Sequence, residues 1–507
     1  MKHLWKRMVS ALLICLCVLT VSPVAQAQER RFSDVPASHW AAEDIAASVD
    51  AGLFLGRKNG KFGLGQKMTR AAFATTLTRL FGWKTVSPAV GSFADNQDRD
   101  KWYYAAVETA YANGAATHQS ENFRPNDAIT REEMAVMLVR ALNYETLAGL
   151  ALSLPLPFTD VTTGGGYLSV AYALGIMGGV SATRFAPSRP ATREQAAVAL
   201  MRVYRQLNAP LTSLCGIDGV GGETAAHAMT AVAVPAARLT VSGKLQNLME
   251  PAKSAALHDK WKAAGTKTLL GIDGTAAVLA GSPDVAAIAQ AVEAGGWDGV
   301  QLDITGVTAR DKTKLTDLAT ALRAALGKKT LYLVAEAPLW QGGGGTGYDY
   351  APLAKTADRL ILRIAPYDQS PDGFPTAPPD PFEEVYYALS RVGQLVPREK
   401  LSLLLTTTGT LWTGSGDTVR RGGKLSAAQL HSLLQSGESH YAGRYQAAYL
   451  TANVDGARQV AWYLDETAVR ARVVLASGLG VHSLCLSDLS SVADYGDYSI
   501  VQPIFGS

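Results

Sequence analysis

The fold of the larger part of this 507-residue chain is decided by the stretch Trp297–Val307, which reads WDGVQLDITGV. Apolar and polar side chains alternate along its centre, as they do along a β-strand with two different faces. The apolar face holds Val300, Leu302 and Ile304, and the polar face holds Gln301, Asp303 and Thr305. Because burying polar side chains is unfavourable unless they are hydrogen-bonded, a polar column along one strand indicates a site.

Seven other stretches have the length and the apolar content of strands. They are Ser213–Ile217, Met229–Val234, Thr268–Ile272, Thr330–Val334, Arg359–Ile364, Leu401–Leu405 and Val481–Leu486. Helical patterns such as Asp284–Ala294 and Lys312–Ala325 lie between most of them. Eight strands alternating with helices predict a (β/α)8 barrel over residues 208–507, and a doubly wound open sheet is the alternative. No Gly-x-Gly-x-x-Gly follows the first strand, so no dinucleotide cofactor is expected.

Several of the predicted strands end in carboxylates. These residues are Asp218, Asp273, Asp303, Glu336, Asp368 and Asp488. In a (β/α)8 barrel the chemistry lies at the carboxyl ends of the strands, so such residues are candidates for a site. Carboxylates in these positions also serve as plain loop caps, and the sequence leaves both readings open.

The barrel region resembles glycoside hydrolase family 18, whose signature is Asp-Gly-x-Asp-x-Asp-x-Glu. The stretch Asp298–Asp303 matches its first part, and Tyr367–Asp368 at the end of the sixth strand resembles the Met-x-Tyr-Asp of that family. Tyr348–Tyr350 and Ala357–Arg359 are similar to the spore-germination and peptidoglycan-associated subgroup, and Trp462–Asp465 also agrees. The resemblance spans about residues 211–500.

The chain departs from this family where the chemistry is performed. In the family the last Glu of the signature protonates the glycosidic oxygen, and the acetamido group of the substrate attacks. Thr305 stands in that position, Gln301 replaces the middle Asp, and the Trp expected on the barrel floor maps to about Ser487. A hydroxyl cannot act as an acid near neutral pH, and a general acid contributes about 10²–10⁴-fold. The sequence therefore favours an active site that has lost its catalytic function.

Three hypotheses follow for the barrel: it binds a glycan without hydrolysing it, it is an active hydrolase with another acid such as Glu336, or it is a structural or interaction module. The candidate residues are Asp303, Tyr367, Asp368 and Glu336 in catalytic positions, with Thr305 at the acid position, and Asp298, Gln301, Trp340 and Trp412 along a glycan groove. The substrates that the resemblance implies are chitin- or peptidoglycan-type glycans of N-acetylglucosamine.

The N-terminal third of the chain is a threefold repeat. Phe-x-Asp recurs with its Asp at positions 34, 95 and 160, followed by Trp40, Trp102 and Tyr167. Each unit then has glycine-centred turns, an aromatic residue and a closing Thr-Arg, with the arginines at 70, 131 and 193. An apolar-periodic helix begins after each Thr-Arg, and another follows each Trp or Tyr. Because one such unit buries little by itself, the three should pack together as an all-α bundle.

The Thr-Arg positions suggest an anion site. Thr130 and Glu133 form a capping box, and Thr192 with Gln195 is a variant of it. Thr69 has Ala72 three residues later, and the alanine side chain cannot accept the backbone N–H of the N-cap residue in return. Capping explains the threonine, but an arginine in the first turn opposes the helix dipole. Arginine beside free backbone N–H groups would instead bind an anion well.

Residues 31–207 resemble three S-layer homology domains, with boundaries expected at 28–90, 91–150 and 151–207. That family anchors exported bacterial proteins to secondary cell-wall polysaccharide, often through a pyruvate ketal, which implies a carboxylate ligand. The polysaccharide-binding residues that the resemblance implies are Asp34, Trp40, Arg70, Asp95, Trp102, Arg131, Asp160, Tyr167 and Arg193. The third repeat departs, with Tyr167 for Trp and Gly164–Gly166 for Pro-x-x-His, so its binding is left open.

The first 27 residues read as a cleaved secretory signal. Lys2, Lys6 and Arg7 precede an apolar core, and Ala25–Ala27 is a small-x-small cleavage site. Removing the three basic residues from 47 basic and 44 acidic leaves a balanced mature chain. We therefore expect a secreted protein of the bacterial cell wall or surface layer, with no nucleic-acid partner and no membrane contact after cleavage.

Two cysteines remain in the mature chain, and no metal or other cofactor is expected. Cys215 and Cys485 fall on the first and last strands, which are neighbours in a closed barrel. A disulfide between adjacent parallel strands is geometrically awkward, so two buried thiols are favoured, although a bridge stays open. No cysteine or histidine has the spacing of zinc ligands.

Overall fold

A computed structural model of the chain describes residues 32–492 except 58, 119, 152–155, 221–228, 341, 368–375, 416–417 and 455, and beyond them residue 504. The predicted signal lies outside the described residues. The chain divides into two compact units. The first comprises residues up to 134 with 187–201, and the second comprises 135–186 with the chain from 202 onward.

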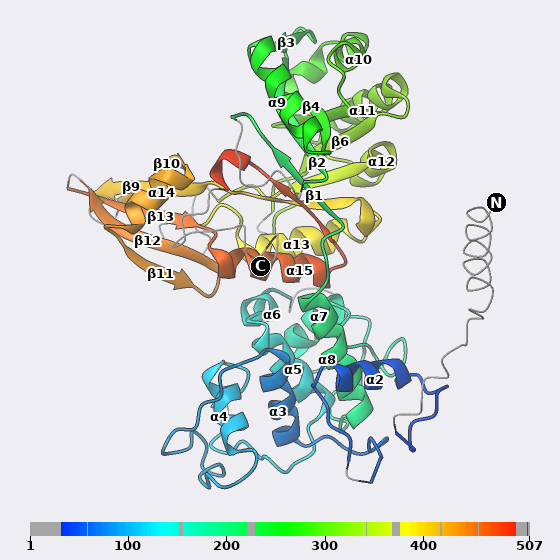
Figure 1. The fold of residues 1–507 in the computed structure, drawn as a ribbon, viewed down its shortest axis with the longest axis vertical. Helices are drawn as coiled ribbons and strands as arrows, with labels where there is room; N and C mark the ends of the chain where they lie inside the picture. The colour runs from blue at the N-terminus through cyan, green and yellow to red at the C-terminus, as the bar shows by residue number, and fades with distance from the viewer. Residues whose placement is uncertain are drawn as a thin grey trace, which may run out of the picture. The chain divides into compact units, whose positions relative to one another are not determined.

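The repeats are helical, as predicted (blue to teal in Figure 1). Their helices are α2 (Ala42–Asp50), α3 (Arg70–Leu80), α4 (Tyr104–Ala112), α5 (Arg131–Ala141), α6 (Glu145–Ala151), α7 (Gly165–Ala173) and α8 (Arg193–Leu207). The helices that follow Thr-Arg begin at the three arginines themselves, in α3, α5 and α8. Two details differ from the prediction: α6 is an additional helix, and α7 already contains Tyr167 instead of following it.

Short antiparallel bridges connect successive repeats in a ring within the first unit. Thr69 pairs with Ala128, Thr130 with Pro190, and Lys67 with Thr192. The third bridge brings the closing Thr-Arg of the last repeat back to the first repeat. Backbone hydrogen bonds follow the same cycle, because the N–H of Arg70 donates to Asp127, that of Arg131 to Arg189 and that of Arg193 to Gln66.

The second unit contains a closed barrel of eight parallel strands. They are β1 (Ser213–Ile217), β2 (Ala231–Leu239), β4 (Lys267–Thr275), β5 (Gly299–Thr305), β6 (Thr330–Glu336), β7 (Arg359–Arg363), β8 (Leu401–Leu405) and β14 (Ser483–Leu486). They pair in sequence order, and β1 closes the barrel by pairing with both β14 and β2. The predicted (β/α)8 barrel is confirmed, and the open sheet is excluded. The short strand β3 (Leu245–Asn247) extends β2 as an antiparallel hairpin.

Helices follow most of the barrel strands. They are α9 (Pro251–Ala263), α10 (Val285–Ala294), α11 (Lys312–Leu326), α12 (Tyr350–Thr356), α13 (Phe382–Val392) and α15 (Glu466–Gly478), with the 3-10 turns η1 (Ala276–Ala280), η2 (Arg398–Lys400) and η3 (Leu489–Ser491). Asp284 and Asp465 cap α10 and α15, because each carboxylate accepts a backbone N–H from the first turn.

A second sheet lies between β8 and α15 in the chain and was not predicted. Its strands are β9 (Gly409–Ser415), β10 (Thr418–Leu425), β11 (Glu438–Ala442), β12 (Ala447–Val454) and β13 (Ala457–Tyr463), with α14 (Ala427–Leu434) after β10. They pair antiparallel in the order β10-β9-β13-β12-β11, and they appear in orange in Figure 1. Below we call them the antiparallel sheet.

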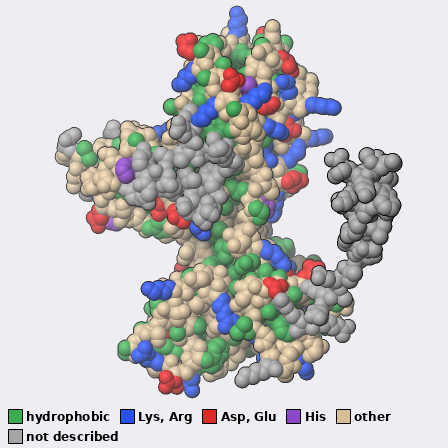
Figure 2. Space-filling view, in the orientation of Figure 1, with side chains coloured by type: hydrophobic (Ala, Val, Ile, Leu, Met, Phe, Trp, Pro, Cys, Tyr) green, Lys and Arg blue, Asp and Glu red, His purple; other side chains and the backbone are tan. Residues whose placement is uncertain are grey.

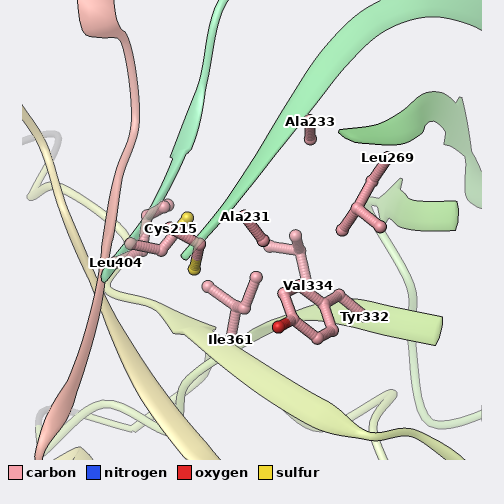
Figure 3. Packing of buried hydrophobic residues seen from close by; sticks show 9 residues of the cluster. Cys215, Ala231, Ala233, Leu269, Tyr332, Val334, Ile361 and Leu404 are labelled. Carbon is pink, nitrogen blue, oxygen red and sulfur yellow. The ribbon is translucent and has the colours of Figure 1, made fainter. Parts of the chain in front are cut away.

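Part of the barrel lumen is filled by apolar side chains. The cluster consists of Cys215, Ala231, Ala233, Leu269, Tyr332, Val334, Ile361, Leu404 and Cys485. Figure 3 shows the labelled members converging on one interior space. Cys215 and Cys485 are opposite each other in the β1–β14 register, and both are buried free thiols. The lumen is therefore a packed core here, which leaves the carboxyl ends of the strands for chemistry.

Candidate functional site

The polar column of β5 lies on the lumen face of the barrel. In the strand register Gln301 is opposite Tyr332, and Asp303 is opposite Val334. Both partners belong to the apolar lumen cluster, and residues opposite each other in a parallel sheet share a face. The alternation read from the sequence therefore directs Gln301, Asp303 and Thr305 into the barrel.

Arg363 neutralises the carboxylates at this level of the lumen. Its Nη1 lies 2.5 Å from Oδ2 of Asp303, and its Nη2 lies 3.6 Å from Oε1 of Glu336. Burial lowers the pKa of Arg363, but the adjacent Asp303 carboxylate outweighs burial and raises it. Two catalytic candidates thus share one cation. Sequence reasoning missed Arg363, although its place opposite Glu336 follows from the register of β6 and β7.

Thr305 is engaged with the backbone. Its hydroxyl donates to the carbonyl of Gly274 at 3.2 Å, on the neighbouring strand β4. Gln301 is 4% exposed, and its Oε1 has no hydrogen-bond partner among the described residues, as is also true of Oδ1 of Asp303. Unpaired buried acceptors are unfavourable, so this level of the lumen is suited to an enclosed hydrogen-bond donor such as a water molecule.

A second group of polar residues joins the end of β7 to α13. Tyr367 donates its hydroxyl to Glu384 at 2.5 Å, and the backbone N–H of Trp340 donates to the other oxygen of Glu384 at 2.6 Å. Glu383 beside it is 2% exposed, and burial raises its pKa to about 7. The sequence analysis missed both glutamates, because no motif in the sequence connects α13 with Tyr367. Asp368 lies outside the described residues.

Other carboxylates at strand ends have partners close by. Asp218 is fully buried and accepts from Nε1 of Trp261 at 2.7 Å. Asp273 forms a two-bond pair with Arg238 at 3.0 and 2.7 Å. Asp488 accepts the N–H of Ser490 in η3. Asp218 and Asp488 therefore act as loop caps, because Asp218 also accepts the N–H of Val220, whereas Asp273 pairs with an arginine on the neighbouring strand.

Two residues expected in the glycan groove lie elsewhere. Asp298 precedes β5 at the end opposite Thr305, where its carboxylate accepts from the N–H and hydroxyl of Thr268. Trp412 is 2% exposed and donates Nε1 to the carbonyl of Ala377, within the packing of the antiparallel sheet. Neither side chain is available to a sugar at the carboxyl ends of the strands.

In the repeats, the three aspartates tie the chain to its aromatic turns. Asp34 accepts from the N–H of Phe62 at 2.7 Å, Asp95 from that of Phe123 at 2.8 Å, and Asp160 from that of Phe185 at 2.8 Å. Further backbone N–H groups bind the second oxygen in each case. Although burial acts in the other direction, these hydrogen bonds lower the pKa of Asp34. The aspartates therefore position the loops, and their carboxylate oxygens are already engaged.

Two of the arginines occupy equivalent places. Nε of Arg70 donates to the carbonyl of Phe123 at 2.7 Å, and its guanidinium lies 4.8 Å from that ring centre. Nε of Arg193 donates to the carbonyl of Phe62 at 3.0 Å, again 4.8 Å from the ring centre. Arg131 is 6% exposed. The guanidinium groups of Arg70 and Arg193 are thus each held over the aromatic ring of a turn in another repeat.

The aromatic residues after the aspartates differ in exposure. Trp40 and Trp102 are 62% and 66% exposed, which suits stacking on a sugar. Tyr167 is only partly exposed, because its hydroxyl donates to Glu145 at 2.6 Å and Arg140 lies over its ring. The departure of the third repeat in sequence is therefore matched by a different local structure.

Charges of both signs are mixed on the face that Figure 2 shows. In Figure 2 the Lys and Arg side chains are interspersed with Asp and Glu on the face shown. Among the described residues, no helix is long and apolar enough to cross a membrane. Within the same residues, no group of three or more His, Cys, Asp or Glu is arranged to hold a metal ion.

Comparison with known families agrees with both halves of the chain. The model described as S-layer homology domain matches residues 31–74, 92–135 and 157–197, and that described as Glycosyl hydrolases family 18 matches residues 254–483. An S-layer protein of Bacillus thuringiensis subsp. finitimus is 33% identical over 192 residues, which are 37% of this chain and 22% of that protein. An endoglucanase of Bacillus sp. (strain KSM-635) is 32% identical over 208 residues, 38% of this chain and 21% of that protein. The chain therefore spans less than a quarter of the length of these relatives.

Among solved structures, the chain is similar to a chitinase from Chromobacterium violaceum ATCC 12472. The match has a TM-score of 0.50 at 18% identity and covers 58% of this chain and 99% of that one. At this identity the likeness concerns the fold alone.

Proposed function

Because the chain carries three S-layer homology domains followed by a glycosyl hydrolase family 18 domain, we propose that the repeats anchor it to wall polysaccharide and that the barrel binds a glycan without hydrolysing it. The repeats and the S-layer relatives indicate a secreted protein of the bacterial cell surface. The glycan classes that suit the barrel are chitin- and peptidoglycan-type chains of N-acetylglucosamine.

The observation that carries the non-hydrolytic proposal is the pairing of Asp303 with Arg363 beside a threonine at the acid position. A glycosidase needs a protonated acid at the leaving oxygen and a group that stabilises the developing positive charge. Thr305 supplies no proton near neutral pH, and Arg363 places a positive charge 2.5 Å from Asp303, where the transition state would develop its own. The side chains of Asp303 and Glu336 are still 24% and 25% exposed, which leaves carboxylate surface for hydrogen bonds to a bound glycan.

One observation favours the second candidate, an active hydrolase with a different acid. Burial raises the pKa of Glu383 to about 7, which is the range in which a carboxylic acid can protonate a leaving group. Glu383 adjoins Glu384, the acceptor of the Tyr367 hydroxyl. Glu336, the substitute acid expected from the sequence, lies 3.6 Å from Nη2 of Arg363, with which it forms an ion pair.

Binding and turnover by the full chain separate these candidates. We expect chitooligosaccharides or peptidoglycan fragments to bind, as measured by calorimetry, with no reducing ends released by wild type or by Glu383→Gln and Glu336→Gln. Turnover that disappears in either variant would establish the hydrolase instead. If neither glycan binds, the barrel is a structural or interaction module.

Sedimentation with cell-wall sacculi tests the anchoring half. The full chain should sediment with sacculi, and removing the wall polysaccharide from them should abolish this. Changing Arg70, Arg131 and Arg193 together to Ala should have the same effect, while the barrel keeps its glycan binding as an internal control of folding. Sedimentation that survives both treatments would contradict the proposal.

A further inference from the structure

A basic hollow surrounds Tyr172 in the second unit, and we propose that it binds a phosphodiester-linked polymer. The hollow consists of two cavities of about 550 and 470 Å³, and both are lined by Tyr172 and Gly175. We call them the α8 cavity and the α13 cavity, and together the junction hollow. The proposal goes beyond the proposed function, because neither the Thr-Arg positions of the repeats nor the carboxyl ends of the barrel strands line this hollow.

The walls of the junction hollow are fixed by packing within the second unit. The ring of Tyr144, before α6, lies 5.4 Å from that of Phe382 at the start of α13. At the end of α15, a Cβ added to Gly478 would lie 2.9 Å from the side chain of Leu174, which follows α7. Because α7 approaches α13 and α15 this closely, the hollow is a space that the packed helices leave between them.

The lining of the junction hollow is strongly basic. The α8 cavity is lined by Arg202, Arg205 and His482, and the α13 cavity by Arg391 and Arg398. No Asp or Glu occurs among the described residues that line either cavity. The mature chain is expected to have equal numbers of basic and acidic residues, so four arginines with no carboxylate in the same lining form a local positive surface. Such a surface attracts anions.

The hollow lies at the end of the barrel opposite the candidate glycan site. Arg398 belongs to η2, which directly precedes β8, and His482 directly precedes β14. These positions are at the amino ends of the strands, whereas Asp303 and Thr305 lie at the carboxyl end of β5. The junction hollow is therefore separate from the lumen site.

Neutral groups hold two of the arginines in place. Nη1 of Arg202 donates to the carbonyl of Ile176 at 3.3 Å. The side chain of Arg398 lies against the backbone at Gly480, where an added Cβ would be 2.9 Å from its Cδ. Neither contact is with a carboxylate, so both arginines keep their full charge for a ligand.

The ends of helices account for only part of this charge. Arg205 and Arg391 lie in the last turns of α8 and α13, where a cation also balances the partial negative charge of the helix end. Arg202 lies before the last turn of α8, and Arg398 belongs to a three-residue turn. Stabilisation of helix ends therefore does not explain why these two arginines join the same lining.

The arrangement of the arginines selects the class of ligand. Tyr172 is 43% exposed and lines both cavities, so a pair of arginines is present in each of two cavities that meet at one aromatic residue. A ligand that fills both cavities needs negative groups at intervals along a chain. Phosphate oxygens are bound by arginine together with glutamine and tyrosine side chains, and Gln394 and Tyr172 are available in this lining. A phosphodiester-linked chain meets these requirements.

Calorimetry on the full chain tests the ligand class with synthetic glycerol phosphate oligomers that contain one, three or six phosphodiesters. We expect the longest oligomer to bind with a dissociation constant on the order of 10⁻⁴ M, and the shortest at least about tenfold more weakly, because it can occupy only one cavity. This affinity is too weak to hold the chain on sacculi without the repeats. The controls are hexaglutamate, a carboxylate chain, and uncharged polyglycerol.

Variants in each cavity test the site. Arg202→Gln and Arg398→Gln should each weaken binding of the longest oligomer at least about threefold, and the double variant at least about tenfold. Arg470→Gln is the matched control, because Arg470 pairs with Glu466 on the surface of α15 and lines neither cavity, and it should bind as wild type does. Thermal unfolding without ligand shows whether each variant is folded.

Three results would overturn the proposal. The first is the absence of binding to wild type, and the second is tighter binding of hexaglutamate than of the longest phosphodiester oligomer. The third is a double variant that is less stable than wild type but binds the oligomer equally well, since the arginines would then serve the helix ends alone. Binding that requires both arginines and increases with the number of phosphodiesters would establish the site.

Discussion

At the end of β5 the hydroxyl of Thr305 donates to Gly274, and Asp303 beside it pairs with Arg363. Thr305 and Arg363 affect different requirements of glycoside hydrolysis. Thr305 replaces the proton donor, and Arg363 adds a positive charge beside Asp303. Restoring a glutamate at position 305 would therefore leave the charge of Arg363 in place. Under the proposed non-hydrolytic function, Thr305→Glu alone should therefore still release no reducing ends from chitooligosaccharides.

Glu383 makes stability depend on pH. Its pKa rises from 4.5 to about 7 on folding because of burial. Between these values the folded state keeps a proton that the unfolded chain has released, so stability falls as the pH rises from about 4.5 to 7. The fall is on the order of 3 kcal/mol at 1.36 kcal/mol per pKa unit. Glu383→Gln, which cannot ionise, should lack this decline in urea unfolding followed at pH 5 and pH 8.

The control for Glu383 is Glu399→Gln, an exposed glutamate of η2 in the same unit. It should follow the wild-type dependence of stability on pH. If Glu383→Gln also follows it, the carboxyl of Glu383 ionises alike in both states and the assignment is wrong.

At the scale of elements, Arg472 joins three parts of the second unit. It is fully buried on α15, and its guanidinium donates to the carbonyls of Gln446, Ala468 and Asp380. Removing a charged donor from several buried carbonyls leaves them unpaired, so Arg472→Gln should lower the free energy of unfolding by about 3 kcal/mol. Arg470→Gln, on the same helix but 65% exposed, should change it by less than about 0.5 kcal/mol. Similar losses in both variants, measured by urea unfolding, would contradict this role.

The elements that sequence predicted best are those with local signals. All eight barrel strands were predicted, because each is a short apolar run bounded by turns or helices, and the repeat helices begin at the predicted Thr-Arg positions. The antiparallel sheet was missed although most of its pairings are hairpins between consecutive strands; only β9 and β13 are distant partners, with Thr413 opposite Gln459. Its strands β10 (TVRRGGKL) and β11 (ESHYA) contain few apolar residues, so they carry weak signals of their own.

The candidate site was predicted only where its signal lies within one strand. The lumen-facing column followed from alternation along one strand. The partner of Asp303 did not, because Arg363 comes 60 residues later and is brought there only by the closure of the barrel. Trp412 was assigned to a glycan groove because aromatic side chains often line such grooves. In the structure it is buried and packs within the antiparallel sheet.

At the scale of the whole molecule, the balance of charge limits how the protein can hold the wall. Without the predicted signal the chain has equal numbers of basic and acidic residues, so bulk attraction to an anionic polymer cannot provide the binding. We expect affinity for sacculi to fall less than about tenfold between 0.05 and 0.5 M NaCl, because a few partly buried arginine contacts are weakly screened. Cosedimentation across this range measures it, with cytochrome c as a basic protein whose binding should collapse. A collapse for this chain as well would point to bulk charge.

The bridge between Lys67 and Thr192 has a consequence for how such an anchor can change. An open solenoid can lengthen by one unit at a time, because each repeat contacts only its neighbours. Here the last repeat pairs back onto the first, so the set is complete at three. A fourth copy would find no partner, and losing one would open the ring. Duplication can therefore extend the anchor only by whole triplets, whereas moving the chain termini from one repeat junction to another would preserve every pairing.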